Sequence, residues 1–307
     1  MDTRRIGSLE VSVVGLGCNN FGRRLDAQAT SAAVDAALEA GITFFDTADT
    51  YGDTKSEKYL GRALGRRREG VVVATKFGSR IDEQRRGARP EYVHRAVDDS
   101  LRRLGTDRID LYQLHWPDPE VPIGETLGAL DELVRAGKVR EIGCSNFSAD
   151  QLREAEEATR DGAARFVSVQ NEYSLLHRET EQDVLPECKR LGIAFVPYFP
   201  LANGLLTGKY RRGQAAPAGS RLDSSRGERL LTEENLAVVE RLIEFSASRG
   251  HTILELAFSW LLRLPTVASV IAGATSPEQA RSNAAAAGWD LTHAELAEVD
   301  ALMTSLG

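Results

Sequence analysis

The sequence lacks the long hydrophobic runs that membrane proteins carry. None of its apolar stretches approaches the roughly 18 residues that a membrane-spanning helix needs. The opening residues 1–6 (MDTRRI) also lack the apolar core of a signal peptide. We therefore expect a cytoplasmic protein that does not associate with membranes.

Cysteine is scarce as well, with three residues in a chain of 307. Cys18, Cys144 and Cys188 lie far apart, and their spacing fits neither a zinc site nor a redox motif. We therefore expect three reduced, buried thiols that pack as small hydrophobic groups, and no metal site.

The sequence has no excess of positive charge. Its 38 basic residues are outnumbered by 45 acidic ones, which gives a net charge of −7, and the two signs are interspersed. This balance argues against a broad surface for nucleic acid or for anionic membranes. No low-complexity linker divides the chain, so we expect one domain over residues 1–307, and the sequence does not define its oligomeric state.

What the sequence does contain is a repeated unit. Each unit has a short apolar, β-branched run, then an amphipathic helical stretch, then Gly or Pro. Alternating strands and helices indicate a parallel sheet with helical crossovers. Eight units in about 300 residues favour an α/β fold, the (β/α)8 TIM barrel, over an open, doubly wound sheet. The eight predicted strands cover residues 13–16, 42–45, 71–74, 109–112, 141–144, 166–169, 193–196 and 267–271.

Capping residues mark several of the predicted helices. Residues 5–12 predict a small β-hairpin before the first barrel strand, and we expect a helix at the C-terminus. The helices with clear boundaries are residues 26–40 before Gly41, a helix from Pro90 to Leu104 before Gly105, one opened by a capping box of Ser148 and Gln151, and residues 126–135 with an apolar face.

Two glycine-rich features need separate interpretation. Gly15, Gly17 and Gly22 are similar to part of a dinucleotide fingerprint, but Asn20 occupies the third glycine position and no helix opens there. We interpret these glycines as permitting a turn and a close backbone approach at a strand end. Residues 208–229 are rich in Gly, Arg, Ser and Ala and predict a long functional or disordered loop after the seventh strand.

Ionisable residues stand at the ends of three consecutive predicted strands, namely Asp46, Lys76 and His115. Taken singly, the aspartate could cap a turn, the lysine could face solvent, and the histidine could be a satisfied core residue. Chemistry in a barrel of this kind gathers where the strands end. Together with Tyr51 in the loop after the second strand, these side chains are therefore expected to meet at one rim.

Asp, Tyr, Lys and His form a coherent acid–base set. A buried ammonium beside a phenol favours the phenolate, so we expect Lys76 to lower the pKa of Tyr51 from about 10. Asp46 would offset the cost of burying that ammonium. Tyr51 could then donate a proton to a developing alkoxide while His115 hydrogen-bonds the carbonyl oxygen. Side chains cannot supply a hydride, so carbonyl reduction would require a nicotinamide.

Further motifs accompany these four residues along the chain. They are residues 46–52 (DTADTYG) with Ser56 and Glu57, 74–76 (ATK), 114–117 (LHWP), 142–147 (IGCSNF), 170–173 (QNEY), 197–201 (PYFPL), 204–209 (GLLTGK) and 273–279 (GATSPEQ). Each motif is weak alone, but the ordered set is specific and covers nearly the whole chain. In this order the motifs resemble the aldo-keto reductase family.

The resemblance implies an NADPH-dependent oxidoreductase that reduces an aldehyde or ketone to an alcohol. Tyr51 would be the general acid, tuned by Asp46 and Lys76, and His115 would place the substrate carbonyl. NADPH would lie extended across the barrel rim. The residues implied in binding it are Ser145, Asn146 and Gln170 for the nicotinamide amide, Tyr198 with the adjoining Phe199 and Pro200 for the ring, Leu201, Asn203 and Leu205 for the pyrophosphate, and Gly273, Thr275, Gln279 and Asn283 for the adenosine.

One departure from the family pattern concerns the choice of cofactor. Some branches place Lys and Arg at the positions of Gly273 and Gln279 to hold the 2′-phosphate, and neither basic residue is present here. Other branches draw the charge from the loop after the seventh strand, which here contains Lys209 and Arg221. A charge-assisted phosphate contact favours NADPH over NADH, so NADPH is the predicted cofactor.

The alternative function on the same fold is an NADPH-binding regulatory or sensor subunit with slow turnover, like the potassium-channel β subunits. The four residues do not exclude it. An unrelated barrel enzyme, such as a lyase or a glycosidase, would need paired acids or a metal at the strand ends, and the sequence has neither constellation. The carbonyl substrate is not defined, because specificity in such barrels lies in loops. Trp116 and Phe21 are equally candidates for lining its pocket and for packing.

Overall fold

The computed structural model describes residues 1–223 and 225–304. Parallel strands alternate with helices along the chain, as the sequence pattern predicts. The strands of the barrel are β3 (Val14–Gly17), β4 (Phe44–Asp46), β5 (Val72–Phe77), β6 (Ile109–Leu114), β7 (Val139–Ser145), β8 (Phe166–Gln170), β9 (Ala194–Phe195) and β10 (Val270–Gly273). The helices are α1 (Ala27–Glu39), α2 (Lys55–Leu64), α3 (Pro90–Leu104), α4 (Ile123–Arg135), α5 (Ala149–Ala158), α6 (Val184–Leu191), α7 (Ser225–Leu230), α8 (Glu233–Ala247), α9 (Ile253–Leu262), α10 (Pro277–Ala285) and α11 (His293–Thr304), with 3₁₀ turns at Gly65–Gly70, Glu179–Glu181 and Ala202–Thr207.

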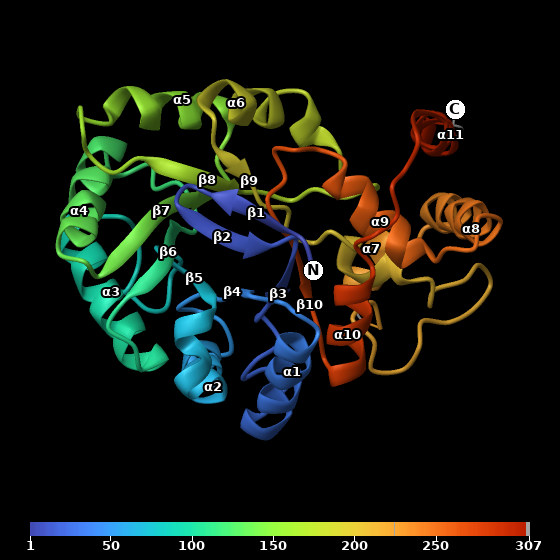
Figure 1. Ribbon diagram of the computed structural model, residues 1–307, viewed down its shortest axis with the longest axis horizontal. Helices are drawn as coiled ribbons and strands as arrows, with labels where there is room; N and C mark the ends of the chain where they lie inside the picture. The colour runs from blue at the N-terminus through green and yellow to red at the C-terminus, as the bar shows by residue number, and fades with distance from the viewer. Residues whose placement is uncertain (224, 305–307) are drawn as a thin grey trace.

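The eight strands form one curled parallel sheet in the order β10-β3-β4-β5-β6-β7-β8-β9. The two outer strands meet through the chain just before β10. Phe195 donates its backbone N–H to Thr266 at 2.8 Å, and Ala268 donates to Phe195 at 3.0 Å. Helices surround the strands in Figure 1. This arrangement confirms the predicted (β/α)8 barrel, including the C-terminal helix α11.

A two-stranded hairpin closes one end of the barrel. Strand β1 (Thr3–Ile6) pairs antiparallel with β2 (Leu9–Ser12), as predicted. Ile6 and Leu9 are fully buried in one cluster with Phe44 and Leu111, which point into the barrel. The hairpin lies across the barrel opening in Figure 1. The hairpin does not cover the other end of the barrel, where the carboxyl ends of the strands lie, so a binding site can form there.

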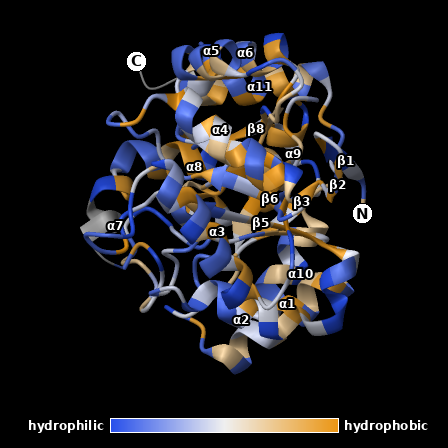
Figure 2. Ribbon diagram, turned by 90° about the vertical axis from the view of Figure 1, so that its left-hand side faces the viewer, coloured by the Kyte–Doolittle hydropathy of each residue, from blue (hydrophilic) through white to orange (hydrophobic). Residues whose placement is uncertain are grey.

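The hydrophobic core has two parts. A small cluster fills the barrel interior, and a larger one lies between the strands and the surrounding helices. The central strands β5, β6 and β8 are largely hydrophobic in Figure 2, and hydrophilic residues gather on the helices and loops around them. Cys18, Cys144 and Cys188 are buried free thiols, as expected. Among the described residues, no helix combines the length and the apolar character that crossing a membrane requires.

The predicted caps are present where the sequence signals were strong. The side chain of Asp26 accepts a hydrogen bond from Ala29 and begins α1. Helix α3 runs from Pro90 to Leu104 and ends at a left-handed Gly105. Ser148 and Gln151 form a reciprocal capping box on α5. Local side-chain chemistry therefore decided these boundaries.

Two predicted boundaries were wrong. Helix α4 begins at Ile123, three residues before the predicted start, because Pro122 can precede a helix without an apolar periodicity of its own. The segment predicted to be irregular over residues 208–229 contains α7 from Ser225 onward. Residue 224, within the same prediction, lies outside the described residues.

Candidate active site

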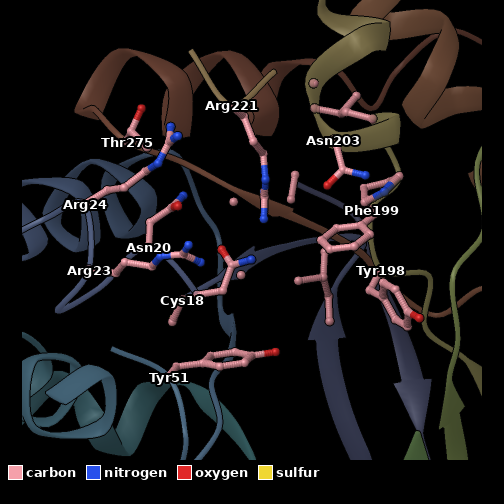
Figure 3. Close-up of a pocket in the computed structure, with 18 of the residues that line it drawn as sticks. Cys18, Asn20, Arg23, Arg24, Tyr51, Tyr198, Phe199, Asn203, Arg221 and Thr275 are labelled. Carbon is pink, nitrogen blue, oxygen red and sulfur yellow. The ribbon is translucent and has the colours of Figure 1, made fainter. Parts of the chain in front are cut away.

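The carboxyl ends of the barrel strands surround a cavity of about 1110 Å³. Its wall takes residues from the segments that follow β3, β4, β6, β7, β8, β9 and β10. Asp46, Tyr51 and His115 lie in this wall, as the strand-end argument predicts. Figure 3 shows the Tyr51 hydroxyl pointing into the cavity and Arg221 reaching in from the opposite side.

A buried ion pair lies beneath the cavity. The Lys76 ammonium nitrogen is 2.6 Å from Oδ2 of Asp46 and donates to the carbonyl oxygen of Thr47 at 2.9 Å. The lysine side chain is fully buried, and it does not contribute to the cavity wall. Two charges removed from water stay favourable only when their remaining hydrogen-bonding groups also find partners. This ion pair therefore depends on the groups around it.

Two glutamine side chains complete the hydrogen bonding of the carboxylate. Gln170 donates its Nε2 to Oδ1 of Asp46 at 3.0 Å, and Gln113 donates its Nε2 to the same oxygen at 3.3 Å. Both oxygens of Asp46 are thus occupied, and its orientation toward Lys76 is fixed. Gln170 was predicted only as a cofactor contact, and Gln113 was not among the predicted site residues.

Tyr51 lies directly against this ion pair. The Lys76 nitrogen is 5.3 Å from the centre of the Tyr51 ring. Burial raises the pKa of Tyr51 above its ordinary value, and the opposing effect of the Lys76 charge is smaller, while the Asp46 charge adds to the increase. The expected net decrease of this pKa was therefore wrong, although Lys76 acts in the expected direction. The phenol keeps its proton at neutral pH, as a proton donor must.

Lys76 keeps its charge in spite of its burial. Burial alone lowers the pKa of an ammonium, but the charge of Asp46, the neighbouring Tyr51 and hydrogen bonds to both raise the pKa of Lys76 above its ordinary value. The site therefore holds an ammonium next to a protonated phenol, and this ammonium can stabilise the phenolate that forms when the proton leaves.

His115 is neutral in this site. Its ring stands edge-on to that of Tyr51, with the ring centres 5.9 Å apart. Burial and the nearby Lys76 charge lower the pKa of His115 to about 3. Within the described residues, its buried Nδ1 has no hydrogen-bond partner. A neutral imidazole suits a hydrogen bond to a substrate oxygen and does not suit the role of a strong acid.

The residues after Tyr51 hold its loop in place. The hydroxyl of Ser56 donates to the carbonyl of Cys18 at 2.9 Å and lies 2.8 Å from the hydroxyl of Thr47. Glu57 accepts from Arg103 at 2.5 Å and is fully buried. The Ser–Glu pair that accompanies the tyrosine motif therefore positions the loop and lies outside the cavity wall.

The residues proposed for the nicotinamide amide form a connected network. Ser145 donates its hydroxyl to the carbonyl of Gln170 at 2.7 Å. Asn146 donates its side-chain nitrogen to the carbonyl of His115 at 3.0 Å and to Ser145 at 3.1 Å. Tyr198 donates its hydroxyl to Oδ1 of Asn146 at 2.8 Å, which fixes the orientation of its half-buried ring. All four side chains lie in the cavity wall.

The remaining predicted cofactor residues gather in the same wall, with one exception. Leu205 is fully buried in the core and does not line the cavity. The Arg221 guanidinium lies 5.1 Å from the centre of the Phe199 ring. The predicted residues that the structure brings to this part of the wall are Phe199, Pro200, Leu201, Asn203, Lys209, Arg221, Gly273, Thr275, Gln279 and Asn283.

The loop between β3 and α1 also lines the cavity, although none of its residues was among the predicted cofactor contacts. Asn19, Asn20, Arg23 and Arg24 lie in the wall. Two consecutive arginines in the segment that follows the first predicted strand were the signal that could have identified them. Phe21, on the same loop, is buried in the core and absent from the wall.

Trp116 differs from Phe21 in both respects. Its side chain lines the cavity although it is 54% exposed, so it stands at the mouth. Trp116 and Phe21 were equally expected to line the substrate pocket or to pack in the core. Of these two, only Trp116 faces the space where a substrate would enter.

The chain matches the sequence model described as "Aldo/keto reductase family" over residues 13–304. It is 34% identical to aldo-keto reductase YhdN of Bacillus subtilis, covering 96% of this chain and 91% of that protein. It is also 34% identical to protein tas of Escherichia coli, with 96% and 95% of the two chains covered. Among solved structures, glycerol dehydrogenase AKR11B4 of Gluconobacter oxydans superimposes with a TM-score of 0.86 at 32% identity, over 98% of this chain and 95% of that one.

These similarities extend over nearly the full chain in both sequence and fold, and they include the strands that carry Asp46, Lys76 and His115. Members of the matched family are oxidoreductases that act on small-molecule carbonyl compounds with a nicotinamide cofactor. The chain belongs to the aldo/keto reductase family.

Proposed function

We propose that the protein reduces an aldehyde or ketone to an alcohol with NADPH, and that Tyr51 is the general acid. One observation carries this proposal. A protonated, half-buried phenol lies over a buried Lys76–Asp46 ion pair at the floor of a large cavity, with neutral His115 beside it. That is the combination that protonation of an alkoxide needs, because the acid starts protonated and its conjugate base is stabilised by a fixed cation.

The cavity suits a dinucleotide together with a small substrate. Ligand pockets typically have volumes of about 300–1,000 Å³, and this cavity reaches about 1110 Å³. Its lining combines an aromatic ring, that of Tyr198, with amide and hydroxyl groups and with four basic side chains. When bound, a reduced nicotinamide supplies the hydride that adds to the carbonyl carbon.

The protein's part in the chemistry is the transfer of one proton. As the carbonyl oxygen becomes an alkoxide, Tyr51 donates its hydroxyl proton to that oxygen. The resulting phenolate is stabilised by the Lys76 ammonium. Asp46 holds this ammonium in place through a contact of 2.6 Å between Oδ2 and the lysine nitrogen. Neutral His115 hydrogen-bonds the substrate oxygen before transfer and orients it toward Tyr51. The alcohol product then carries the hydride on carbon and the proton on oxygen.

The proposed cofactor contacts follow from the family resemblance. Ser145, Asn146 and Gln170 would hold the carboxamide, and the Tyr198 ring would stack on the nicotinamide. Leu201 with Asn203 would border the pyrophosphate. The adenosine would lie along Gly273, Thr275, Gln279 and Asn283, and Lys209 and Arg221 add positive charge to the cavity that would hold the phosphates.

The proposal is tested by following NADPH oxidation over a panel of sugar aldehydes, keto-sugars, α-dicarbonyls and pyridoxal, with NADH run in parallel. Because the structurally similar protein is named a glycerol dehydrogenase, the panel also includes glycerol with the oxidised cofactor. We expect at least one compound to turn over at about 1 s⁻¹ or faster with NADPH. Turnover far below this value for every compound would contradict the proposal and favour a slow NADPH-binding sensor.

A further inference from the structure

The loop between β3 and α1 presents two arginines to the cavity. Arg23 and Arg24 are both exposed, and both lie in the cavity wall. The structure gives neither guanidinium an ion-pair partner among the residues that it describes. An exposed cation that faces a cavity without a protein partner is available to a ligand anion.

The charge of the cavity wall is opposite to that of the chain as a whole. The wall contains Arg23, Arg24, Lys209 and Arg221, whereas its described acids are Asp46 and Asp53. Asp46 is already paired with buried Lys76, which leaves Asp53 as the other described acid beside these four basic side chains. A chain of net charge −7 thus concentrates positive charge around one cavity, which favours a ligand with several phosphate groups.

The loop is held against the segment that follows β10. Asn20 donates its side-chain nitrogen to the carbonyl of Ala274 at 3.1 Å. The backbone carbonyl of Asn20 accepts from the N–H groups of Arg23, Arg24 and Leu25 at 2.9–3.2 Å. The two arginines therefore follow a tight turn that begins at Asn20. The side chain of Asn20 is hydrogen-bonded to Ala274, the residue before Thr275. These hydrogen bonds hold the backbone from which both side chains extend.

Arg24 lies at the end of the cavity where Thr275 lies. In Figure 3 its guanidinium reaches toward Thr275, whereas Tyr51 occupies the other end of the view. The guanidinium of Arg221 lies over Phe199, which is in ring contact with Tyr198. Arg221 is therefore engaged toward the nicotinamide side of the proposed binding mode, and Arg24 is the cation on the adenosine side.

No basic side chain of α10 fills this role. Gly273 and Gln279 are neutral, and the Gln279 side-chain oxygen accepts from the N–H of Thr275 at 2.8 Å. Arg281, the basic residue of this helix, lies outside the cavity wall and pairs with Glu39 at 3.2 Å. At the adenosine side of the proposed binding mode, the N-terminus of α10 is compatible with a phosphate. The positive charge there comes from the β3–α1 loop and not from α10.

We propose that Arg24 binds the 2′-phosphate of NADPH and is the residue that sets the preference of this chain for NADPH over NADH. This inference rests on the proposed function, because it places the adenosine along residues 273–283. One arginine on the β3–α1 loop would thus take the place of the two basic residues that other branches carry at the positions of Gly273, in β10, and Gln279, in α10. A bidentate guanidinium–phosphate contact supplies both charge and direction.

Calorimetric titration with 2′,5′-ADP and with 5′-AMP tests the inference without any catalytic turnover. The two probes differ by the 2′-phosphate alone. We expect Arg24→Ala to weaken 2′,5′-ADP binding by about 10- to 100-fold, the loss expected for one charge-assisted contact, and to change 5′-AMP binding less than about twofold. Arg24→Lys should recover part of the loss, because it keeps the charge but not the fork of donors.

Arg281→Ala is the matched control, because it removes one positive charge near the same segment from outside the cavity. It should leave both affinities unchanged. Equal losses of both probes in Arg24→Ala would assign Arg24 to the 5′-phosphate side and overturn the inference, as would unchanged 2′,5′-ADP binding. An inactive wild-type protein that still shows the expected loss in Arg24→Ala would contradict only the proposed reaction.

Discussion

Three side chains at the cavity floor have protonation states that depend on one another. Lys76 is charged because Asp46 and Tyr51 offset its burial, and the same charge helps to keep His115 neutral. Tyr51 remains protonated because burial outweighs the attraction of the ammonium. The charge of Lys76 therefore lowers the pKa of both Tyr51 and His115, but burial is the larger cause in each of these two groups.

A fourth titratable group, Asp49, lies just behind this floor. Burial, and then the neighbouring Glu57 carboxylate, raise the pKa of Asp49 from 3.8 to about 7. Its backbone N–H donates to the carbonyl of Lys76 at 3.1 Å, so it belongs to the same region of the structure. Between these two pKa values the native state keeps a proton that the unfolded chain has released. This group therefore lowers stability as the pH rises from about 4 through about 7.

Asp49→Asn should remove this dependence, because the amide does not titrate. We expect its free energy of unfolding to vary less with pH than that of the wild type over this window. At about pH 8 the variant should be more stable than the wild type by a few kcal/mol, on the order of the shift itself. Urea denaturation at about pH 5 and pH 8 gives both values. The control is Asp107→Asn, whose side chain is 90% exposed. A variant with the wild-type pH dependence would show that Asp49 does not titrate in this way.

The sequence could identify Asp46, Tyr51, Lys76 and His115 because each stands at or just after a predicted strand end. It could not give the direction of the Tyr51 pKa, since that depends on how deeply the ring is buried. The predicted decrease of the Tyr51 pKa took account of the Lys76 charge but not of the free-energy cost of removing a phenolate from water. Gln113 and Gln170 directly follow two of the predicted strands, but their hydrogen bonds to Asp46 depend on how the barrel closes, which the sequence does not give.

The β3–α1 loop and the loop that carries Tyr51 fit together through glycine. Gly52 has φ +58°, and a Cβ there would lie 2.2 Å from the carbonyl oxygen of Phe21. Gly22 has φ +76°, and its Cα is part of the same contact. Because both sides of this contact are backbone atoms, an added side chain at Gly52 could be accommodated only if the backbone of one loop shifted. The position of Tyr51 is thus coupled to the loop that carries Arg23 and Arg24.

Gly52→Ala tests this coupling. The substitution adds left-handed strain of roughly 1–2 kcal/mol and also forces the two loops apart. We expect a total loss of about 3 kcal/mol or more in the free energy of unfolding and a decrease in kcat of at least about tenfold, measured by urea denaturation and by steady-state kinetics.

Gly105→Ala is the matched control, because Gly105 is also in the left-handed region (φ +66°) but a Cβ there meets nothing within 4 Å. It should lose only the strain and keep its kcat. If the two variants behaved alike, contact between the loops would not position Tyr51.

The predicted elements were most accurate where a side chain or a proline caps the helix, as in α1, α3 and α5. Strand β9 has only two residues, yet its apolar run was recognised because Val196 and Pro197 continue it. The early start of α4 and the helix α7 were missed because neither carries an apolar stripe that differs from its surroundings. Short or uniformly polar helices depend on tertiary contacts that a single sequence does not reveal.

The two ends of the barrel have different roles, because one end is packed for stability and the other carries the candidate active site. The hairpin β1–β2 and the interior cluster close the end where the strands begin, and the cavity occupies the end where they finish. Repeated strand–helix units predicted the fold, and the order of the strands follows from their order along the chain. The positive charge of Lys209 and Arg221 at the cavity was predicted, but that of Arg23 and Arg24 was not, since these two arginines come from a segment nearly 200 residues away from Arg221.

Replacement of Tyr51 by phenylalanine tests the proposed reaction most directly, because it removes one hydroxyl and leaves the ring over Lys76. With the best carbonyl substrate, kcat should fall by about 10²- to 10⁴-fold, the usual contribution of a positioned general acid. The dissociation constant for NADPH, measured by fluorescence titration, should stay within about twofold of the wild type. A variant that binds NADPH normally and retains wild-type kcat would contradict the account.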